Sequence, residues 1–325
     1  MLDKKKYLLR IFTEHFTQRN KSQLSFWYEK PEINNNFTKD NIGEYYMVFS
    51  QKADYKGPFD QNGVPLLDYK GDIGKQYNPI AIAQYGLGNY NKFKRTENEH
   101  YKQIFLKQAD WLVSNMEKNK YGLWVWNHKF DWPYYKLLRA PWYSGLAQGQ
   151  CISLLVRAHH EQEDSSYLEC AQKAYLSFEK NISEGGVICY DNKGNTWIEE
   201  YILNPPTHIL NGFIWALWGV YDYFLTTKNN NTIELFWKSC GTLEKNLRYY
   251  DIKFWSLYDL SKTRIKNIAS NYYHSLHIAQ LEAMHLLTGK SIFKEFAQKW
   301  EKYQSNIFNR TFALAWKIVF KLLYF

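Results

Sequence analysis

Several common markers of protein class are scarce or missing in this sequence of 325 residues. The few cysteines share no spacing typical of a metal site, and three lie in apolar surroundings that suit small core residues. They are Cys151, Cys170, Cys189 and Cys240. We therefore expect no metal and a reduced, cytoplasmic compartment. The sequence also has no P-loop or Rossmann fingerprint, so we expect no nucleotide or redox cofactor.

Long apolar runs and dense basic tracts are missing as well. No stretch reaches the roughly 20 apolar residues that span a bilayer. The first residues are partly basic but contain no sustained apolar core, so we expect no signal peptide. The net charge of +9 suits an anionic partner such as an acidic glycan, a nucleic acid or a membrane surface. Because no Lys/Arg-rich tract is present, we expect no nucleic-acid partner.

Aromatic residues, in contrast, are abundant. They make up 18% of the chain, which contains 27 Tyr and 13 Trp. Aromatic rings stack on sugar rings and phenols hydrogen-bond hydroxyl groups, so carbohydrate is the first ligand class to consider. An aromatic-rich helical core is the alternative explanation for part of this content.

The chain repeats one pattern four times, in which a helix opens just after an aromatic-rich loop. The repeated segments begin at 77, 143, 207 and 273, so the steps are 66, 64 and 66 residues. A repeat of this length holds two helices and a connection. Second helices are indicated near 97–117, 164–182, 231–249 and 290–305, and β-like segments lie at 122–126, 186–190, 196–198 and 254–258.

Helical hairpins that repeat in this way bury their faces against one another and stack into an arc or a ring. Asn78 followed by Pro79 is a typical helix start. We therefore predict an all-α fold, an (α/α) barrel of about four helical hairpins with short β-hairpin loops and a small irregular N-terminal segment. The inner helices are expected to begin around one cleft.

The chain divides into three parts on this interpretation. Residues 1–75 form an irregular segment with a short helix at 4–19 and a strand at 44–50, and residues 76–306 form the catalytic barrel. Residues 307–325 form a basic amphipathic helix, in which Arg310, Lys317 and Lys321 share one face. Such a helix either lies in a membrane interface or closes the barrel by packing on it.

Reactive side chains gather in the loops before the third and fourth inner helices. Glu199, Glu200 and Tyr201 precede the third, whereas Tyr258 and Tyr273 flank the start of the fourth. A tyrosine at a helix start is more often a packing residue, and a pair of glutamates is often solvated charge. Helix N-termini that point at one place favour an anionic ligand such as a carboxylate.

A set of motifs in one order carries a resemblance to a known family. The motifs are Tyr77-Asn-Pro-Ile-Ala-Ile-Ala-Gln-Tyr-Gly-Leu87, Trp142-Tyr-Ser-Gly-Leu-Ala-Gln-Gly-Gln-Cys-Ile-Ser153, Trp197-Ile-Glu-Glu-Tyr201, Leu210-Asn-Gly-Phe213, Leu257-Tyr-Asp-Leu260 and Tyr273-His-Ser-Leu-His-Ile278. They resemble the C-terminal catalytic domain of the D-glucuronyl C5-epimerases (heparosan-glucuronate 5-epimerases), over about residues 75–305. The stretch before residue 77 resembles the short form of bacterial members.

The resemblance implies an isomerase with an (α/α) barrel that converts D-glucuronate to L-iduronate within a polymer. It implies catalytic roles for Glu200, Tyr201, Tyr258 and Tyr273, and substrate contact by Asn211. Further substrate-binding candidates at the helix starts are His274, His277, Tyr143, Gln148 and Gln84. Where the family motif continues Tyr-Asp-Leu-Arg, this chain has Ser261. We also expect the family's β-rich domain to be absent or vestigial.

The chemistry suits these residue types. Inverting C5 requires removal of the proton alpha to the carboxylate and addition of a proton from the opposite face, so two acid/base groups must flank the ring. We hypothesise that Glu200 or Tyr201 acts on one face and Tyr273 on the other. Tyr258, Asn211 and the helix starts would then hold the carboxylate.

Two other functions share parts of this pattern. A uronate lyase begins with the same deprotonation and then eliminates the C4 substituent, and a catalytically inactive glycan-binding module would keep only the cleft. For the partner we expect a uronic-acid-containing glycan, including the lipid-linked kind. A basic, apolar C-terminal helix also suits peripheral association with the inner face of a membrane.

Overall fold

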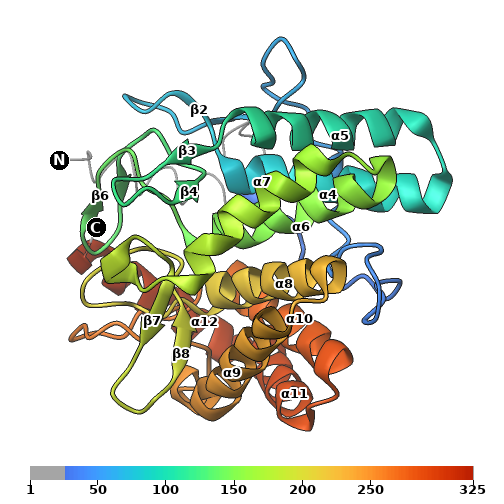
Figure 1. Ribbon diagram of the computed structural model, residues 1–325. Helices are drawn as coiled ribbons and strands as arrows, with labels where there is room; N and C mark the ends of the chain where they lie inside the picture. The colour runs from blue at the N-terminus through green and yellow to red at the C-terminus, as the bar shows by residue number, and fades with distance from the viewer. Residues whose placement is uncertain (1–25, 325) are drawn as a thin grey trace.

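The computed structural model describes residues 26–324, and helices dominate it (Figure 1). Its central part consists of four helical hairpins, as predicted. They are α4 (Pro79–Thr96) with α5 (Glu99–Ser114), α6 (Gly145–Gln162) with α7 (Ser165–Tyr175), α8 (Leu210–Thr227) with α9 (Asn230–Asn246), and α10 (Asn271–Thr288) with α11 (Ser291–Ser305). The predicted second helices are thus confirmed. Short 3₁₀ helices follow α7 at Leu176–Glu179 and Ile182–Glu184, and another follows α9 at Leu247–Tyr250.

The first helix of each hairpin lies inside and the second lies outside, so the fold is an (α/α) barrel. Helices α4, α6, α8 and α10 are mostly buried and contact one another in that order. The approach of α6 to α8 is especially close, because Gly149 faces Ala216 and Gly219 faces Gly149. A Cβ atom added to Gly219 would lie 2.2 Å from the carbonyl oxygen of Gly149. Only glycine permits this backbone contact.

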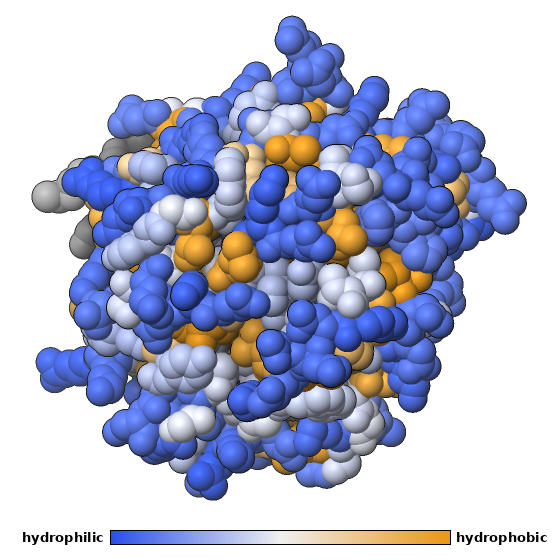
Figure 2. Space-filling view, in the orientation of Figure 1, coloured by the Kyte–Doolittle hydropathy of each residue, from blue (hydrophilic) through white to orange (hydrophobic). Residues whose placement is uncertain are grey.

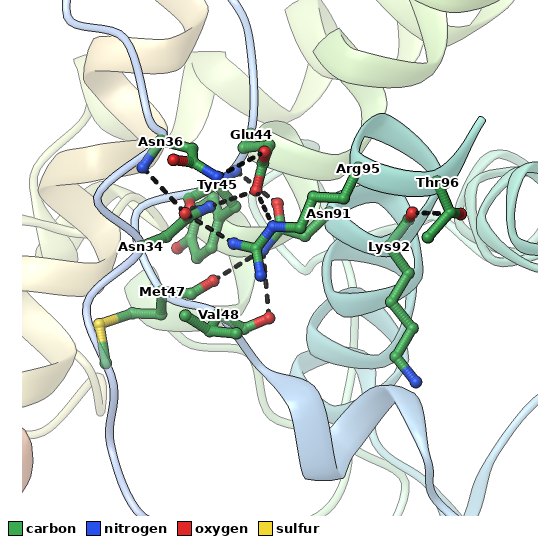
Figure 3. Close-up of polar contacts among 10 residues, drawn as sticks. All are labelled: Asn34, Asn36, Glu44, Tyr45, Met47, Val48, Asn91, Lys92, Arg95 and Thr96. Carbon is green, nitrogen blue, oxygen red and sulfur yellow. Dashed lines mark hydrogen bonds and ion pairs between the residues drawn. The ribbon is translucent and has the colours of Figure 1, made fainter.

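The N-terminal segment packs along α4, where backbone groups bind a helix side chain (Figure 3). Asn91 on α4 accepts a hydrogen bond from the Tyr45 amide at 2.7 Å and donates to the Met47 carbonyl at 2.8 Å. This arrangement makes the predicted strand at 44–50 wrong. Met47 forms a single bridge to Ile33, and α3 (Ser50–Ala53) follows. The predicted helix at 4–19 lies outside the described residues.

The N-terminal segment contacts both the first inner helix, α4, and the last inner helix, α10. Beside Asn91, the Arg95 guanidinium binds the Glu44 carboxylate at 2.7 Å (Figure 3). On its other side, the Tyr28 ring packs edge-on against Tyr272 of α10, with centroids 5.1 Å apart. The segment therefore bridges α4 and α10.

Four short strand pairs gather on the left of Figure 1, the side on which α6 and α8 begin. The pairs are β1 (Leu66–Asp68) with β2 (Lys75–Tyr77), β3 (Glu117–Lys118) with β4 (Trp124–Val125), β5 (Trp132–Pro133) with β6 (Leu137–Leu138), and β7 (Ile188–Tyr190) with β8 (Thr196–Ile198), all antiparallel. The predicted β-like segments at 122–126, 186–190 and 196–198 are confirmed. The segment at 254–258 is not a strand, since only Ser256 and Leu257 form isolated bridges there.

The C-terminal helix α12 (Ile307–Tyr324) packs on the barrel with its cationic face inward. Lys317 donates hydrogen bonds to Asn267 and Ile268, whereas Arg310 is exposed. The outward face of α12 is apolar, and on it Phe308 and Leu323 are 81% and 62% exposed. Of the three cations predicted on one helical face, Lys317 therefore points toward the barrel and Arg310 lies at the surface. The alternative of a helix that packs on the barrel is confirmed.

Figure 2 shows a face that is mainly hydrophilic, with apolar residues in separate patches. In residues 26–324, no helix has the length and apolar character needed to cross a membrane.

Candidate active site

The Glu200 carboxylate lies just after β8, against the first turn of α8. It fits there because residue 212 is a glycine, and a Cβ atom at Gly212 would lie 2.0 Å from Glu200 Oε2. Glu200 is only 5% exposed, and its Oε2 atom has no hydrogen-bond partner among residues 26–324. A buried carboxylate oxygen without a partner is costly, so this position is unusual for a purely structural glutamate.

The preceding residue, Glu199, has the opposite environment. Its Oε2 atom accepts hydrogen bonds from the amides of Thr207 and His208, and its Oε1 atom pairs with the His208 ring. Glu199 therefore anchors the loop that leads into α8. Two adjacent glutamates thus have different roles, and Glu200 is the one that is available for chemistry.

Tyr201, Tyr258 and Tyr273 lie within reach of the Glu200 charge, and together with Tyr134 they form two edge-to-face pairs. The rings of Tyr134 and Tyr201 lie 4.9 Å apart, and those of Tyr258 and Tyr273 lie 4.8 Å apart. Trp142 packs edge-on against Tyr201 at 5.6 Å. We call Tyr134, Tyr201, Tyr258 and Tyr273 the tyrosine cluster; β5 and β6 pack beside it. The structure thus brings all four predicted catalytic residues into one region.

Backbone hydrogen bonds hold the loops that carry these rings. The Leu210 amide at the start of α8 donates to the Tyr258 carbonyl at 3.1 Å. Ser270 caps α10 by accepting from the Tyr273 amide at 3.3 Å. In the described part of the chain, α8 itself has no side-chain cap. Its first amides therefore favour an anion near Asn211.

Behind the tyrosine cluster, the buried Asp259 carboxylate collects several donors. The hydroxyls of Tyr134 and Tyr135 bind its Oδ2 atom at 2.7 and 2.8 Å, and the Asn267 amide binds the same atom at 2.6 Å. Ser261, which occupies the position of the family arginine, donates its hydroxyl to Oδ1. Sequence reasoning missed Tyr134, Tyr135 and Asn267. The only available signal was the adjacent tyrosine pair in an aromatic loop.

Burial controls the protonation of the site. It raises the pKa of Glu200 from 4.5 to about 8, while the Tyr201 hydroxyl opposes this shift and the charges of Glu199 and Asp259 add to it. Burial also raises the pKa of Tyr201, Tyr258 and Tyr273 well above 10. The tyrosines are therefore proton donors, and Glu200 is the group that changes charge near neutral pH.

The two predicted histidines are held in the core. His274 stacks on Trp255, its Nδ1 atom lies 2.8 Å from Ser256 Oγ and its Nε2 atom lies 3.0 Å from the Trp300 carbonyl. His277 Nδ1 lies 3.0 Å from the same serine hydroxyl. Burial lowers the pKa of His274 to about 4 and lowers that of His277 as well, so both rings are neutral.

The remaining predicted binding residues have different surroundings. Gln148 accepts from the Trp126 amide, Gln84 donates to Gln150 at 3.0 Å, and the Tyr143 hydroxyl donates to a carbonyl at 2.7 Å. Three of the predicted binding residues keep a side-chain atom without a partner within residues 26–324, namely Asn211 Oδ1, Gln84 Oε1 and His277 Nε2. Of these three, Asn211 is the one in the first turn of α8, beside Gly212.

Between residues 26 and 324, no group of three or more His, Cys, Asp or Glu side chains is arranged to hold a metal ion.

Comparison with known proteins gives a family match over much of the barrel. The model of the D-glucuronyl C5-epimerase C-terminus matches residues 117–302. A D-glucuronyl C5-epimerase of Caenorhabditis elegans is 32% identical over 221 residues, which are 63% of this chain and 35% of the worm protein. An uncharacterized protein of Methanocaldococcus jannaschii is 28% identical over 246 residues, 71% of this chain and 78% of that protein.

Solved structures are more distant. An unsaturated glucuronyl hydrolase from Bacillus sp. GL1 overlaps with a TM-score of 0.48 and 13% identity, covering 69% of this chain and 61% of that chain. An unsaturated glucuronyl hydrolase specific for heparin has a TM-score of 0.49 and 14% identity, covering 70% and 62%.

Proposed function

The chain belongs to the D-glucuronyl C5-epimerase C-terminal family, and from this premise we propose that it is a uronate C5-epimerase. It would invert D-glucuronate, or a related uronate, to the L-iduronate form within an oligo- or polysaccharide. Because the match spans about a third of the worm enzyme, the activity of that whole protein does not transfer by itself. The proposal therefore depends on the residues around Glu200.

The observation that carries the proposal is the state of the Glu200 carboxylate. Packed against Gly212, it has an oxygen without a partner in the described chain and a pKa raised to about 8. A general base works best when its pKa lies near the working pH, since it then combines basicity with a sufficient ionised fraction. Tyr201, whose pKa is raised well above 10, is a poor base there. Of the two alternatives, we therefore favour Glu200.

The proposed reaction moves one proton off the sugar and another onto it. The Glu200 carboxylate takes the C5 proton, and the electron pair of the C–H bond passes into the carboxylate of the sugar as an enolate. Tyr273 then donates its phenol proton to the opposite face of C5, leaving a tyrosinate. Exchange with water returns a proton to Tyr273 and removes one from Glu200, so the cycle has no net loss or gain of protons.

The sugar carboxylate needs stabilisation while negative charge develops on it. The donors for this role would be the side-chain NH2 group of Asn211 and the amides at the uncapped start of α8, next to Gly212, together with the hydroxyl of Tyr258 in the tyrosine cluster. Amide and phenol donors of this kind stabilise an enolate more than the starting carboxylate when they are fixed in place. Each is a donor whose removal should slow catalysis more than it weakens binding.

One experiment separates this function from its competitors. The protein is incubated in D2O with uronate-containing oligosaccharides and followed by NMR and by absorbance. Deuterium at C5 together with an L-iduronate-type product supports epimerisation. An absorbing unsaturated product would instead indicate a lyase. Binding without either signal would indicate a glycan-binding module and overturn the proposal.

We also propose that the outward face of α12 rests on a lipid surface and brings the site to lipid-linked glycans. Phe308, Phe312, Val319 and Leu323 recur along one stripe and are 81%, 53%, 48% and 62% exposed. A monomer seldom exposes such a stripe without a partner, and the net charge of +9 suits anionic headgroups.

Vesicle flotation tests the membrane proposal. The full chain should float with phosphatidylglycerol vesicles, and Phe308→Ser combined with Phe312→Ser should abolish flotation without loss of epimerase activity on a soluble oligosaccharide. Tyr190→Ser, at another exposed aromatic residue, is the matched control. If wild type and the double variant both stay in the soluble fraction, the membrane proposal is wrong.

A further inference from the structure

Helix α12 reaches the back of the tyrosine cluster, although it lies beyond residue 302, where the family match ends. Lys317 Nζ donates hydrogen bonds to Asn267 Oδ1 and to the Ile268 carbonyl, both at 2.7 Å. The same ammonium lies 5.6 Å from the centre of the Tyr258 ring. Three residues on, Phe320 is fully buried and packs edge-on against Tyr135. The helix thus supports the site from behind.

The contacts of Lys317 continue to Tyr201 through three residues. An ammonium group only donates, so it fixes the Asn267 side chain with its oxygen toward Lys317 and its amide toward Asp259. Asp259 Oδ2 accepts that amide at 2.6 Å and also accepts the Tyr134 hydroxyl at 2.7 Å. The Tyr134 ring in turn packs against Tyr201 at 4.9 Å.

The Asp259 carboxylate needs several donors because it is only 1% exposed. Ser261, at the position where the family has arginine, supplies a hydroxyl. Lys317, from a different part of the chain, keeps the Asn267 amide turned toward the same carboxylate.

We propose that Lys317 is a positioning residue of the site, which holds Tyr258 directly and holds Tyr134 against Tyr201 through Asn267 and Asp259. The C-terminal helix is then part of the catalytic unit, with its inner face serving the site. The inference extends the proposed epimerase function and rests on it for its kinetic tests.

The amine of Lys317 is deeply buried. Burial and the charge of Lys321 lower the pKa of Lys317 well below 10.5, while the charge of Asp259 opposes this shift. We therefore assign to Lys317 the role of a hydrogen-bond donor fixed by geometry, and its test does not depend on its charge.

The test uses the full chain with three substitutions at one residue. Lys317→Met should lower kcat by at least about tenfold with little change in KM. Lys317→Gln, which keeps a donor, should show a smaller loss of kcat. Lys317→Arg, which keeps a donor on a long side chain, should restore most of kcat. Arg310→Met, at an exposed cation on the same helix, is the control.

The outcomes are distinct. A loss of folded protein would lower the measured rate regardless of the donor at residue 317, so an equal loss of kcat in Lys317→Met, Lys317→Gln and Lys317→Arg would overturn the proposal. An activity profile equal to that of the wild type would also overturn it.

A second measurement does not depend on activity. In protein labelled with 3-fluorotyrosine, the ¹⁹F signals of Tyr201 and Tyr258, assigned by Tyr→Phe variants, should move in Lys317→Met and stay in place in Arg310→Met. If the wild type epimerises no uronate glycan, the proposed function fails while these signals still decide the positioning role. Unmoved signals would refute that role even in an active enzyme.

Discussion

Replacing Glu200 with glutamine should change how the stability of the protein depends on pH. Burial raises the pKa of this carboxyl from 4.5 to about 8, so the folded state holds the proton more tightly than the unfolded state. The resulting stability is fully present below pH 4.5 and is lost as the pH rises through about 8.

The size of the effect follows from the shift. One pKa unit corresponds to about 1.4 kcal/mol, so the difference between 4.5 and about 8 is worth up to roughly 5 kcal/mol as an order of magnitude. Glu200 is 5% exposed, so solvent screening reduces this little. Between about pH 5 and pH 8, the wild type should lose on the order of 3 kcal/mol that the variant keeps.

Urea unfolding of wild type and Glu200→Gln at about pH 5 and pH 8 measures this difference directly. All other titrating groups are common to both proteins and cancel in the comparison. Glu169→Gln, at an exposed position on α7, is the control and should follow the wild type. If wild type and Glu200→Gln lose stability in parallel between the two pH values, the account of Glu200 as a neutral buried acid is refuted.

Other predictions test the supporting contacts. Gly212→Ala places a methyl group 2.0 Å from Glu200 Oε2 and should lower kcat by about 100-fold, whereas Gly241→Ala, which meets nothing within 4 Å, should leave kcat unchanged; equal rates would contradict the packing argument. Tyr273→Phe should abolish formation of the inverted L-iduronate product while calorimetry still detects glycan binding, and continued inversion would remove Tyr273 from the mechanism. Arg157→Met breaks a buried ion pair with Asp222 and should cost about 3–5 kcal/mol of unfolding free energy in urea titrations; a loss below about 1 kcal/mol would show that the pair is dispensable.

The helices and the main site residues could be predicted because their signals are local. The Asn78 side chain caps α4 by accepting hydrogen bonds from the amides of Ile80 and Ala81, so all the residues of this interaction are close neighbours in the sequence. Glu200 and Tyr201 stand at a fixed place before an inner helix, so the repeat itself placed them near Tyr273.

Contacts between distant residues could not be predicted in this way. Tyr134 binds Asp259 across 125 positions, and Lys317 binds Asn267 across 50, with no periodicity to indicate either pair. The predicted strand at 44–50 failed for a related reason. Its aromatic pattern suits a strand, but its backbone groups bind the Asn91 side chain, which lies 46 positions from Tyr45.

The rate of C5 deuterium exchange in a uronate oligosaccharide, followed against pH, tests the central claim that Glu200 removes the C5 proton. The account predicts exchange in the wild type that rises with pH up to about 8, the pKa of Glu200, and no exchange in Glu200→Gln that still binds the glycan. Exchange in Glu200→Gln at the wild-type rate would contradict it.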